Sequence, residues 1–391
     1  MTSKRWLAAV PVLLACGASP AAADEFTPVT AAPIAERITA VPGTDGRLHV
    51  VYELALTNTK AAPARLRAVT VRARRGRVLA RFRGERLLAR LRTPLPAPAE
   101  SLVIDPFAQR LLYVELAFRR RAAIPRSIAH RLAVRAAANP AATEPSPLRY
   151  PVAPLRIRSG RPVRITPPLS GPGWVAANGC CRTESVHRGA VQSVNGSLFD
   201  AQRFAIDWVR IDAGGRIVAG DGSHVRNHNA YGAPIRAVAR GRVVSTLARL
   251  PDQPPGQLPD PASITLETVD GNHVVQSIGN GRYAFYAHLQ RGSLTVRPGQ
   301  RVRRGQVIGR LGNSGNTSAP HLHLHVMDSP SVLGSNGVPF VFDRMTRTGR
   351  LSAAEFDAAA SLEGAFSPRI FRRAQPRRDQ LPLDLDIVSF R

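Results

Sequence analysis

The residues whose types and spacing point most directly to chemistry are three histidines at alternate positions, His321, His323 and His325. If residues 320–326 form a β-strand, its two-residue period places the three imidazoles on one face and the intervening apolar side chains in a core. Histidine is a common zinc ligand, and two histidines separated by one residue can reach the same ion. The spacing therefore indicates a metal site, with a metal-free polar pocket as the alternative.

The segments before these histidines indicate how they are positioned. A polar loop of glycine, asparagine and serine residues, 312–319, directly precedes the strand. His288 lies further upstream in a strand-like run, 283–289, and adds a fourth histidine. That run and another at 272–278 flank Gly279-Asn280-Gly281, a sequence typical of a tight β-hairpin turn. We therefore expect a hairpin to carry His288.

Together these segments resemble the lysostaphin/LytM-type zinc metallopeptidases (murein endopeptidases), which hydrolyse peptide cross-links of bacterial peptidoglycan. The similarity extends over about residues 187–345 and includes Tyr231-Gly232-Ala233-Pro234-Ile235 and Arg304-Gly305-Gln306. It implies an antiparallel β domain of the duplicated-hybrid-motif type, zinc as the cofactor and peptidoglycan as the partner. By position, it implies that Asp207 and His323 are metal ligands and that His288 and His321 are catalytic, positioning or deprotonating the attacking water.

One element departs from the family's pattern. The family's His-x-x-x-Asp ligand pair falls in register with Arg203 and Asp207, so an arginine stands where a histidine ligand is expected. A guanidinium stays protonated and has no acceptor, so it cannot bind zinc. Residues four apart on a strand share a face, and we therefore expect Arg203 to pair with Asp207. His325 is the first candidate for a substitute metal ligand. Three further histidines lie in neighbouring segments: His187, His224 and His228.

Two functions stay open at this point. The chain is either an exported zinc endopeptidase that acts on peptidoglycan cross-links, or a catalytically degenerate relative that binds peptidoglycan or activates a partner cell-wall hydrolase. Bound zinc would distinguish them. Residues 299–309 also look like part of a lipoyl or biotinyl carrier, but such carriers need a lysine and none follows Lys60.

Nucleophilic catalysis has little support. The sequence contains no Gly-x-Ser-x-Gly motif, and no helix or charge context activates Cys180 or Cys181. These adjacent cysteines form a vicinal disulfide, remain as buried thiols or link two molecules, and the sequence does not decide among the three.

The chain reads as mainly β, with two domains. In residues 47–58, apolar side chains alternate with His49, Glu53 and Thr57, which predicts a half-buried strand. Similar runs follow, and they suggest an immunoglobulin-like β-sandwich. The resemblance makes this domain a wall-binding or positioning module. The predicted boundaries are a signal peptide at 1–23, the N-terminal β-sandwich at 24–155, a linker rich in proline and glycine at 156–186, the metallopeptidase domain at 187–346, and a C-terminal tail at 347–391 with a short helix at 353–362 and a last strand.

The first residues predict an extracytoplasmic location, periplasmic or secreted. Lys4 and Arg5 precede the apolar run 6–15, which is too short to span a bilayer but typical of a signal peptide. Cleavage after Ala23 is favoured, and the alternative is a lipoprotein anchored through Cys16. No later run is long and apolar enough for a transmembrane span.

The charge balance favours anionic partners. The sequence has 54 Lys and Arg against 27 Asp and Glu, a formal net charge of +27. Nearly all of this charge is arginine, so a compositional bias explains it as well as selection for a polyanion does. Export argues against nucleic acid and makes anionic envelope polymers the natural acidic partners.

Overall fold

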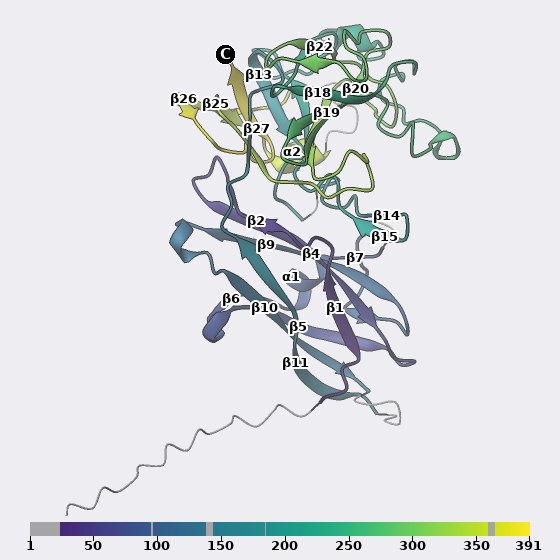
Figure 1. Cartoon of the computed structure of the whole chain (residues 1–391), viewed down its shortest axis with the longest axis vertical. Helices are drawn as coiled ribbons and strands as arrows, with labels where there is room; N and C mark the ends of the chain where they lie inside the picture. The colour runs from purple at the N-terminus through teal and green to yellow at the C-terminus, as the bar shows by residue number, and fades with distance from the viewer. Residues whose placement is uncertain (1–23, 95–96, 138–143, 184, 359–363) are drawn as a thin grey trace, which may run out of the picture.

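The computed structural model describes residues 24–94, 97–137, 144–183, 185–358 and 364–391. They form two β-rich parts stacked along the long axis of the molecule, an N-terminal part (residues 24–158) and a C-terminal part (residues 159–391) (Figure 1). The described helices are short: the α-helices are α1 (Gly84–Leu88) and α2 (Ala353–Ala358). The mainly β prediction is confirmed. The predicted signal peptide, including Cys16, lies outside the described residues.

Within the described ranges, we find no helix with the length and apolar character needed to cross a membrane.

Two sheets with a shared apolar core make up the N-terminal part. One has the strand order β1-β4-β9-β7 with β3 beside β4, and the other β2-β11-β10-β5-β6 with β8 beside β5. Leu54 and Leu112 of the first sheet join Val69 and Leu132 of the second in one cluster. The immunoglobulin-like character of this part stays a prediction. The strands are β1 (Val29–Pro33), β2 (Ile38–Thr39), β3 (Val41–Pro42), β4 (Leu48–Asn58), β5 (Ala64–Ala73), β6 (Val78–Phe82), β7 (Leu91–Arg92), β8 (Val103–Ile104), β9 (Gln109–Phe118), β10 (Ser127–Ala136) and β11 (Ser146–Arg158).

Strand β4 differs from the half-buried strand that its alternation predicts. Its apolar face enters the N-terminal core as expected, but His49 and Glu53 on the other face are also buried. Glu53 is buried because two arginines of the C-terminal part, Arg188 and Arg203, pair with its carboxylate at 3.0 and 2.6 Å. The polar face of β4 is therefore a contact surface between the two parts and not a solvated face.

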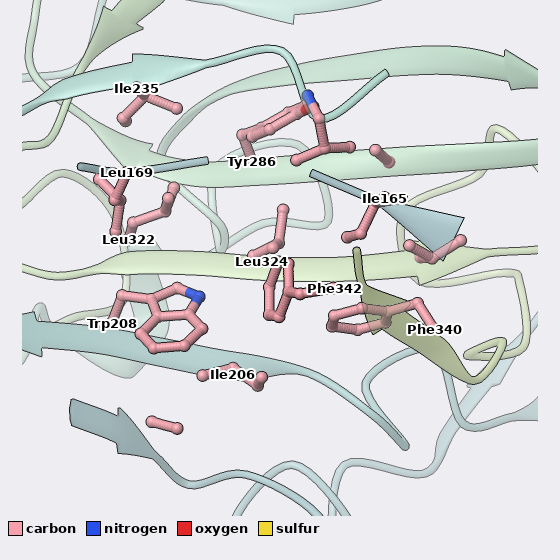
Figure 2. Packing of buried hydrophobic residues seen from close by; sticks show 14 of the residues in the cluster. Ile165, Leu169, Ile206, Trp208, Ile235, Tyr286, Leu322, Leu324, Phe340 and Phe342 are labelled. Carbon is pink, nitrogen blue, oxygen red and sulfur yellow. The ribbon is translucent and has the colours of Figure 1, made fainter. Parts of the chain in front are cut away.

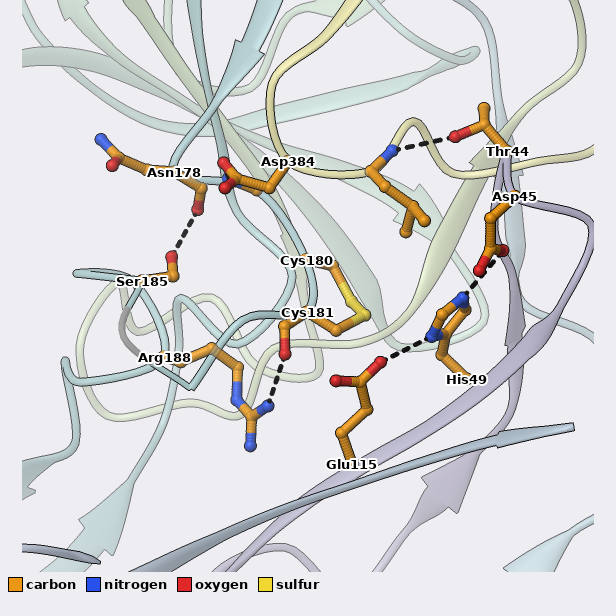
Figure 3. The surroundings of a disulfide bond; sticks show 12 residues. Thr44, Asp45, His49, Glu115, Asn178, Cys180, Cys181, Ser185, Arg188 and Asp384 are labelled. Carbon is orange, nitrogen blue, oxygen red and sulfur yellow. Dashed lines mark hydrogen bonds and ion pairs between the residues drawn. A yellow bond between two sulfur atoms is a disulfide. The ribbon is translucent and has the colours of Figure 1, made fainter. Parts of the chain in front are cut away.

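The same contact surface contains the adjacent cysteines. Cys180 and Cys181 form a disulfide, so of the three alternatives the structure has the vicinal one (Figure 3). The backbone oxygen of Cys181 accepts a hydrogen bond from Arg188 at 3.3 Å. Nearby, the ring of His49 lies between two carboxylates, 2.8 Å from Glu115 and 3.1 Å from Asp45.

A buried histidine makes the stability of the N-terminal part depend on pH. The hydroxyl of Tyr52 lies 2.7 Å from Nε2 of His130 on β10, and Nδ1 of His130 lies 3.0 Å from the backbone oxygen of Ala153. Burial lowers the pKa of His130 from 6.5 to about 4. Between pH 6.5 and about 4, His130 is therefore protonated in the unfolded chain but neutral in the folded chain. The free energy of unfolding falls as the pH is lowered through this range.

We expect this histidine to cost about 2 kcal/mol of unfolding free energy between pH 7 and pH 5. His130→Gln should remove that share of the pH dependence, whatever its effect at pH 7. Denaturant unfolding of both proteins at the two pH values measures it. Equal losses of stability in the two proteins would contradict the assignment.

A ten-stranded antiparallel sheet, in the order β21-β18-β19-β20-β23-β16-β13-β27-β25-β26, dominates the C-terminal part. One face carries a large apolar core that includes Trp208, Leu322, Leu324 and Phe342 (Figure 2). The strands of the sheet are β13 (Gly171–Ala177), β16 (Ile206–Arg210), β18 (Gly241–Leu247), β19 (Asn272–Gly279), β20 (Arg282–Leu289), β21 (Arg301–Val302), β23 (Leu322–Met327), β25 (Met345–Arg350), β26 (Arg369–Arg377) and β27 (Asp386–Phe390). Outside it, β12 (Val163–Ile165) pairs with β24 (Phe340–Phe342), β14 (Gln192–Val194) with β15 (Ser197–Phe199), and β17 (Pro234–Arg236) with β22 (Val307–Arg310).

The described residues of the segment predicted as a linker, 156–186, instead contain the end of β11 and, from residue 159, belong to the C-terminal part. The segment supplies β12 and the central strand β13, which lies between β16 and β27. At least one of its glycines serves close packing, because a side chain at Gly173 would collide with the backbone oxygen of Ile211. The tail also belongs to this sheet through β25, β26 and β27, and α2 forms where a short helix was expected. Residues 359–363 lie outside the described residues.

Candidate metal centre and cleft

Strands β16, β20 and β23 position the site. In the sheet, β23 lies between the other two, with His323 opposite Asp207 of β16 and opposite Ala287 of β20. His288 follows Ala287 near the end of β20, and the hairpin of β19 and β20 is the one that the sequence predicted. Leu322, Leu324 and Val326 enter the core, so the strand presents His323 and His325 on its other face, as predicted.

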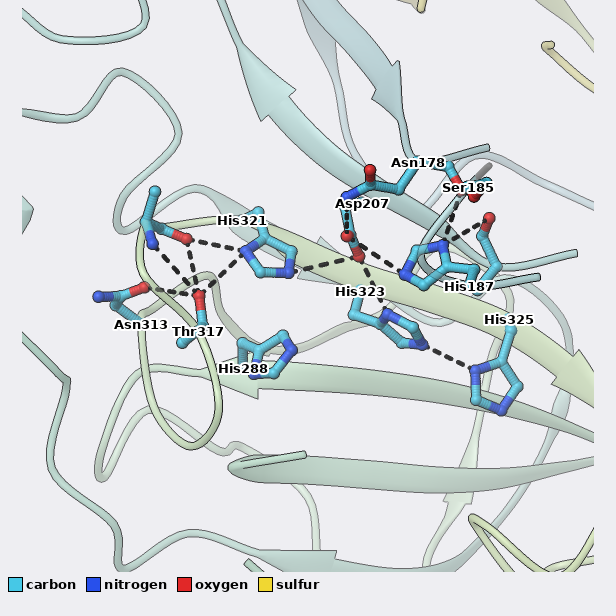
Figure 4. A network of polar contacts seen from close by, with 12 residues as sticks. Asn178, Ser185, His187, Asp207, His288, Asn313, Thr317, His321, His323 and His325 are labelled. Atoms are coloured by element: carbon cyan, nitrogen blue, oxygen red, sulfur yellow. Dashed lines mark hydrogen bonds and ion pairs between the residues drawn. The ribbon is translucent and has the colours of Figure 1, made fainter. Parts of the chain in front are cut away.

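The carboxylate of Asp207 is the centre of a buried polar cluster (Figure 4). Its two oxygens lie 3.2 Å from Nε2 of His187, 3.0 Å from Nδ1 of His323 and 3.3 Å from Nε2 of His321. Asn178 donates a further hydrogen bond to it at 2.8 Å. Ligand atoms of His187, Asp207 and His323 lie within 4.8 Å of one another, so these three residues could hold a metal ion.

The hydrogen bonds around His187 fit a cation at this position. Its Nδ1 lies 2.8 Å from the backbone oxygen of Asn178 and 3.2 Å from that of Ala205. An imidazole that donates from Nδ1 to carbonyl oxygens turns the lone pair of Nε2 towards Asp207. A lone pair facing a carboxylate is repulsive unless a proton or a metal ion lies between them. The donor set, two imidazoles and one carboxylate, is the kind that zinc takes in proteins.

Burial and neighbouring charges shift the pKa values of the cluster so that its ligand groups have the protonation states that bind a metal ion. Burial lowers the pKa of His323 to about 4, and it also lowers the pKa of His288 well below its usual range. Both rings are therefore neutral at pH 7, the form in which imidazole binds a metal. Burial alone would raise the pKa of Asp207, but His187 and His321 hold that pKa well below its usual range. Asp207 is thus an anion surrounded by imidazoles.

One sequence prediction about this centre needs correction, and the role of His325 stays a prediction. The predicted pair of Arg203 and Asp207 is wrong: the guanidinium of Arg203 lies 2.6 Å from Glu53 and 3.6 Å from Asp200. The reason is local, since β16 begins only at Ile206 and Arg203 lies in the preceding turn, where the two-residue period does not apply. His325 contacts His323, with 2.9 Å between its Nδ1 and Nε2 of that ring, and it is not part of the three-residue group.

His187 takes the position for which the sequence offered several candidates. It is twenty residues before Asp207 and lies outside the described strands, so no spacing rule marks it as a ligand. His224 pairs with Asp221, and His228 contacts the backbone oxygen of Gly222, so neither of these histidines joins the group.

His288 and His321 lie together beside the group, with ring centroids 4.6 Å apart. Nδ1 of His288 is 2.8 Å from the backbone oxygen of Ser314, and Nδ1 of His321 is 2.8 Å from that of Ala319. Both carbonyls belong to the polar loop before β23. This loop therefore orients both rings with Nε2 away from the carbonyls.

A cleft of about 490 Å³ opens onto these side chains. Burial raises the pKa of one acid in its wall, Asp270, to about 7. No arginine or lysine is among the described residues that line it. They are Ala177, Asn178, Val186, His187, Gln202, Asp207, Val209, Leu258, Val269, Asp270, His288, Asn316, Thr317, Ser318, Ala319, His321, His323 and Phe356.

Comparison with known proteins gives a family match for part of this site. Residues 222–336 match the sequence profile of Peptidase family M23. A segment of 57 residues is 44% identical to the peptidoglycan DD-endopeptidase ShyA of Vibrio cholerae serotype O1, and a segment of 54 residues is 44% identical to ShyC of the same organism. These segments cover 15% and 14% of this chain, but only 13% and 12% of the two relatives.

Solved structures give distant matches. The catalytic domain of lysostaphin from Staphylococcus simulans is 21% identical, with 37% of this chain and 80% of that chain covered and a TM-score of 0.23. A mutant catalytic domain of the prophage-encoded M23 protein EnpA from Enterococcus faecalis is 21% identical, with 33% and 77% covered and a TM-score of 0.21.

The matched range contains His288, His321 and His323, whereas His187 and Asp207 precede it. The sequence resemblance to the lysostaphin/LytM type is thereby confirmed for this range. Residues 222–336 of the chain belong to a domain of peptidase family M23.

Proposed function

We propose that this chain is an extracytoplasmic zinc metalloendopeptidase that hydrolyses peptide cross-links of peptidoglycan. The observation that carries the proposal is the convergence of three buried side chains with zinc-ligand chemistry, His187, Asp207 and His323, next to two further histidines at a cleft. The names of ShyA and ShyC, both peptidoglycan DD-endopeptidases, support this substrate class.

In this proposal His187, Asp207 and His323 hold the zinc ion. Bound there, zinc would supply a Lewis acid that polarises the scissile carbonyl and makes water a nucleophile at neutral pH. His325 contacts the other ring nitrogen of His323 and keeps that ring oriented, the usual task of an outer-shell partner.

His288 and His321 act on the substrate and the water. Because the Nδ1 atoms of both rings contact backbone carbonyls, both rings turn Nε2 away from those carbonyls, and Nε2 of His321 lies 3.3 Å from the carboxylate of Asp207. The low pKa of His288 keeps it neutral, which suits a group that accepts a proton or donates a hydrogen bond in the cleft. Asp207 raises the pKa of His321 against the effect of burial, which suits a group that stabilises negative charge on the carbonyl oxygen.

The alternative, a degenerate relative that only binds peptidoglycan or activates a partner hydrolase, was motivated by Arg203. That arginine pairs with Glu53, and a histidine stands beside Asp207 in its place. The residues present therefore favour the enzyme. We further propose that residues 1–23 direct export, that the N-terminal part is an immunoglobulin-like module that positions the enzyme on the wall, and that anionic envelope polymers attract its basic surface.

Zinc analysis and hydrolysis of cross-linked muropeptides test the proposal. We expect one zinc ion per chain and cleavage that a chelator stops. His288→Ala should keep the zinc and lower kcat roughly 10²- to 10⁴-fold, the usual worth of acid–base catalysis. A wild-type protein that binds stoichiometric zinc and cleaves no wall peptide would contradict the enzyme and restore the binding alternative.

A further inference from the structure

The acid in the wall of the cleft, Asp270, is not one of the three residues that could hold the metal ion. It ends the loop before β19, is 5% exposed, and lines the cleft together with the histidines. Among the residues that the structure describes, no side chain or backbone group makes a hydrogen bond or ion pair with its carboxylate. A buried carboxylate without a partner is costly, and such a cost is tolerated where a ligand supplies the partner.

Asp270 is held next to the catalytic histidines. Its backbone oxygen accepts a hydrogen bond from the backbone N–H of His288 at 3.1 Å. The next residue, Gly271, has φ of +65°, and a side chain there would collide with the backbone oxygen of Ser314. That same oxygen contacts Nδ1 of His288. The chain therefore fixes Asp270 and His288 against one loop, and both residues line the same cleft.

The charges of the cleft select for a cation. The protein carries 54 lysines and arginines among 391 residues, yet none of them is among the described residues that line the cleft. The lining has two carboxylates, and Asp207 is already shared by three histidines. Asp270 is therefore the carboxylate of the cleft that a ligand could contact. An ammonium group offers three donors to such a carboxylate, and a charged partner of this kind makes a strong hydrogen bond.

We propose that Asp270 is a specificity residue that binds a primary ammonium group of the peptide in the cleft, close to the bond that is cleaved. The inference rests on the proposed function, and it adds the chemical class of peptide that the site prefers: one with a free amine beside the scissile bond.

Two synthetic peptides that differ only in this amine, free or acetylated, test the proposal. For the wild-type protein we expect kcat/KM to be roughly 10- to 100-fold higher for the free amine, the worth of a hydrogen bond to a charged group. Asp270→Asn has the same shape and should reduce the ratio to about 1, chiefly by slowing the free-amine peptide. The matched control is Glu267→Gln, which removes one acid from the same loop outside the cleft and should leave the ratio unchanged.

The possible failures are distinguishable. If the wild-type protein cleaves neither peptide, the proposed function fails. The ratio of the Kd values of the acetylated and free-amine peptides then tests whether Asp270 binds the amine. Equal values for the free and acetylated peptides in the wild-type protein would overturn the inference. So would an Asp270→Asn variant that keeps the preference, slows both peptides equally or loses its zinc, since Asp270 would then support the metal centre and not select the substrate.

Discussion

His187→Ala should abolish stoichiometric zinc binding and, with it, hydrolysis. His187 supplies one of the three ligand atoms that lie within 4.8 Å of one another, and catalytic zinc sites normally keep three protein ligands. The loss of affinity should exceed the roughly 10- to 100-fold that an outer-shell residue is worth. Competition with a chelator of known affinity measures the loss.

Two other histidines make the experiment selective. His325 contacts His323 and lies outside the ligand group, so His325→Ala should weaken zinc only by roughly 10- to 100-fold and still bind one ion at saturation. His224 is exposed and pairs with Asp221, so His224→Ala should change nothing. A larger loss of zinc affinity in His325→Ala than in His187→Ala would show that His325, and not His187, is the metal ligand.

Much of the site could be predicted from sequence because local periodicity positions it. The alternation around His323 defines which side chains face the core, and the Gly-Asn-Gly turn sets the hairpin that carries His288. These features depend on residues within one or two strands of each other. Asp207 also follows the period, because it lies within β16.

The errors come from contacts between residues distant in sequence. His187 reaches Asp207 from outside any described strand, and its neighbour Arg188 is fixed by Glu53, 135 residues earlier in the chain. Arg203 was placed on a strand that begins three residues later. Glu53 itself looked like a solvated residue, because alternation within β4 says nothing about a second domain that covers its polar face.

Glu53→Gln is therefore expected to lower the free energy of unfolding by roughly 3–5 kcal/mol, the cost of leaving buried charges without their partner. The side chains of Glu53 and Arg188 are fully buried and that of Arg203 is 3% exposed. The substitution preserves shape and removes the charge that both guanidinium groups share. Denaturant unfolding measures the effect, and Glu100→Gln, an exposed glutamate of the same part, should stay within about 0.5 kcal/mol of the wild type.

The metal centre should respond to the same substitution. Arg188 adjoins His187 in the chain, and Arg203 lies in the turn that leads to Asp207, so Glu53 holds both segments that bring ligands to the site. We expect Glu53→Gln to weaken zinc binding as well as stability. Arg203→His should likewise lose stability and gain no zinc affinity, because it leaves Glu53 with one guanidinium fewer and places an imidazole away from Asp207. Tighter zinc binding by Arg203→His would contradict this arrangement. Unchanged zinc affinity in Glu53→Gln would show that the contact with the N-terminal part stabilises the fold but does not position the metal ligands.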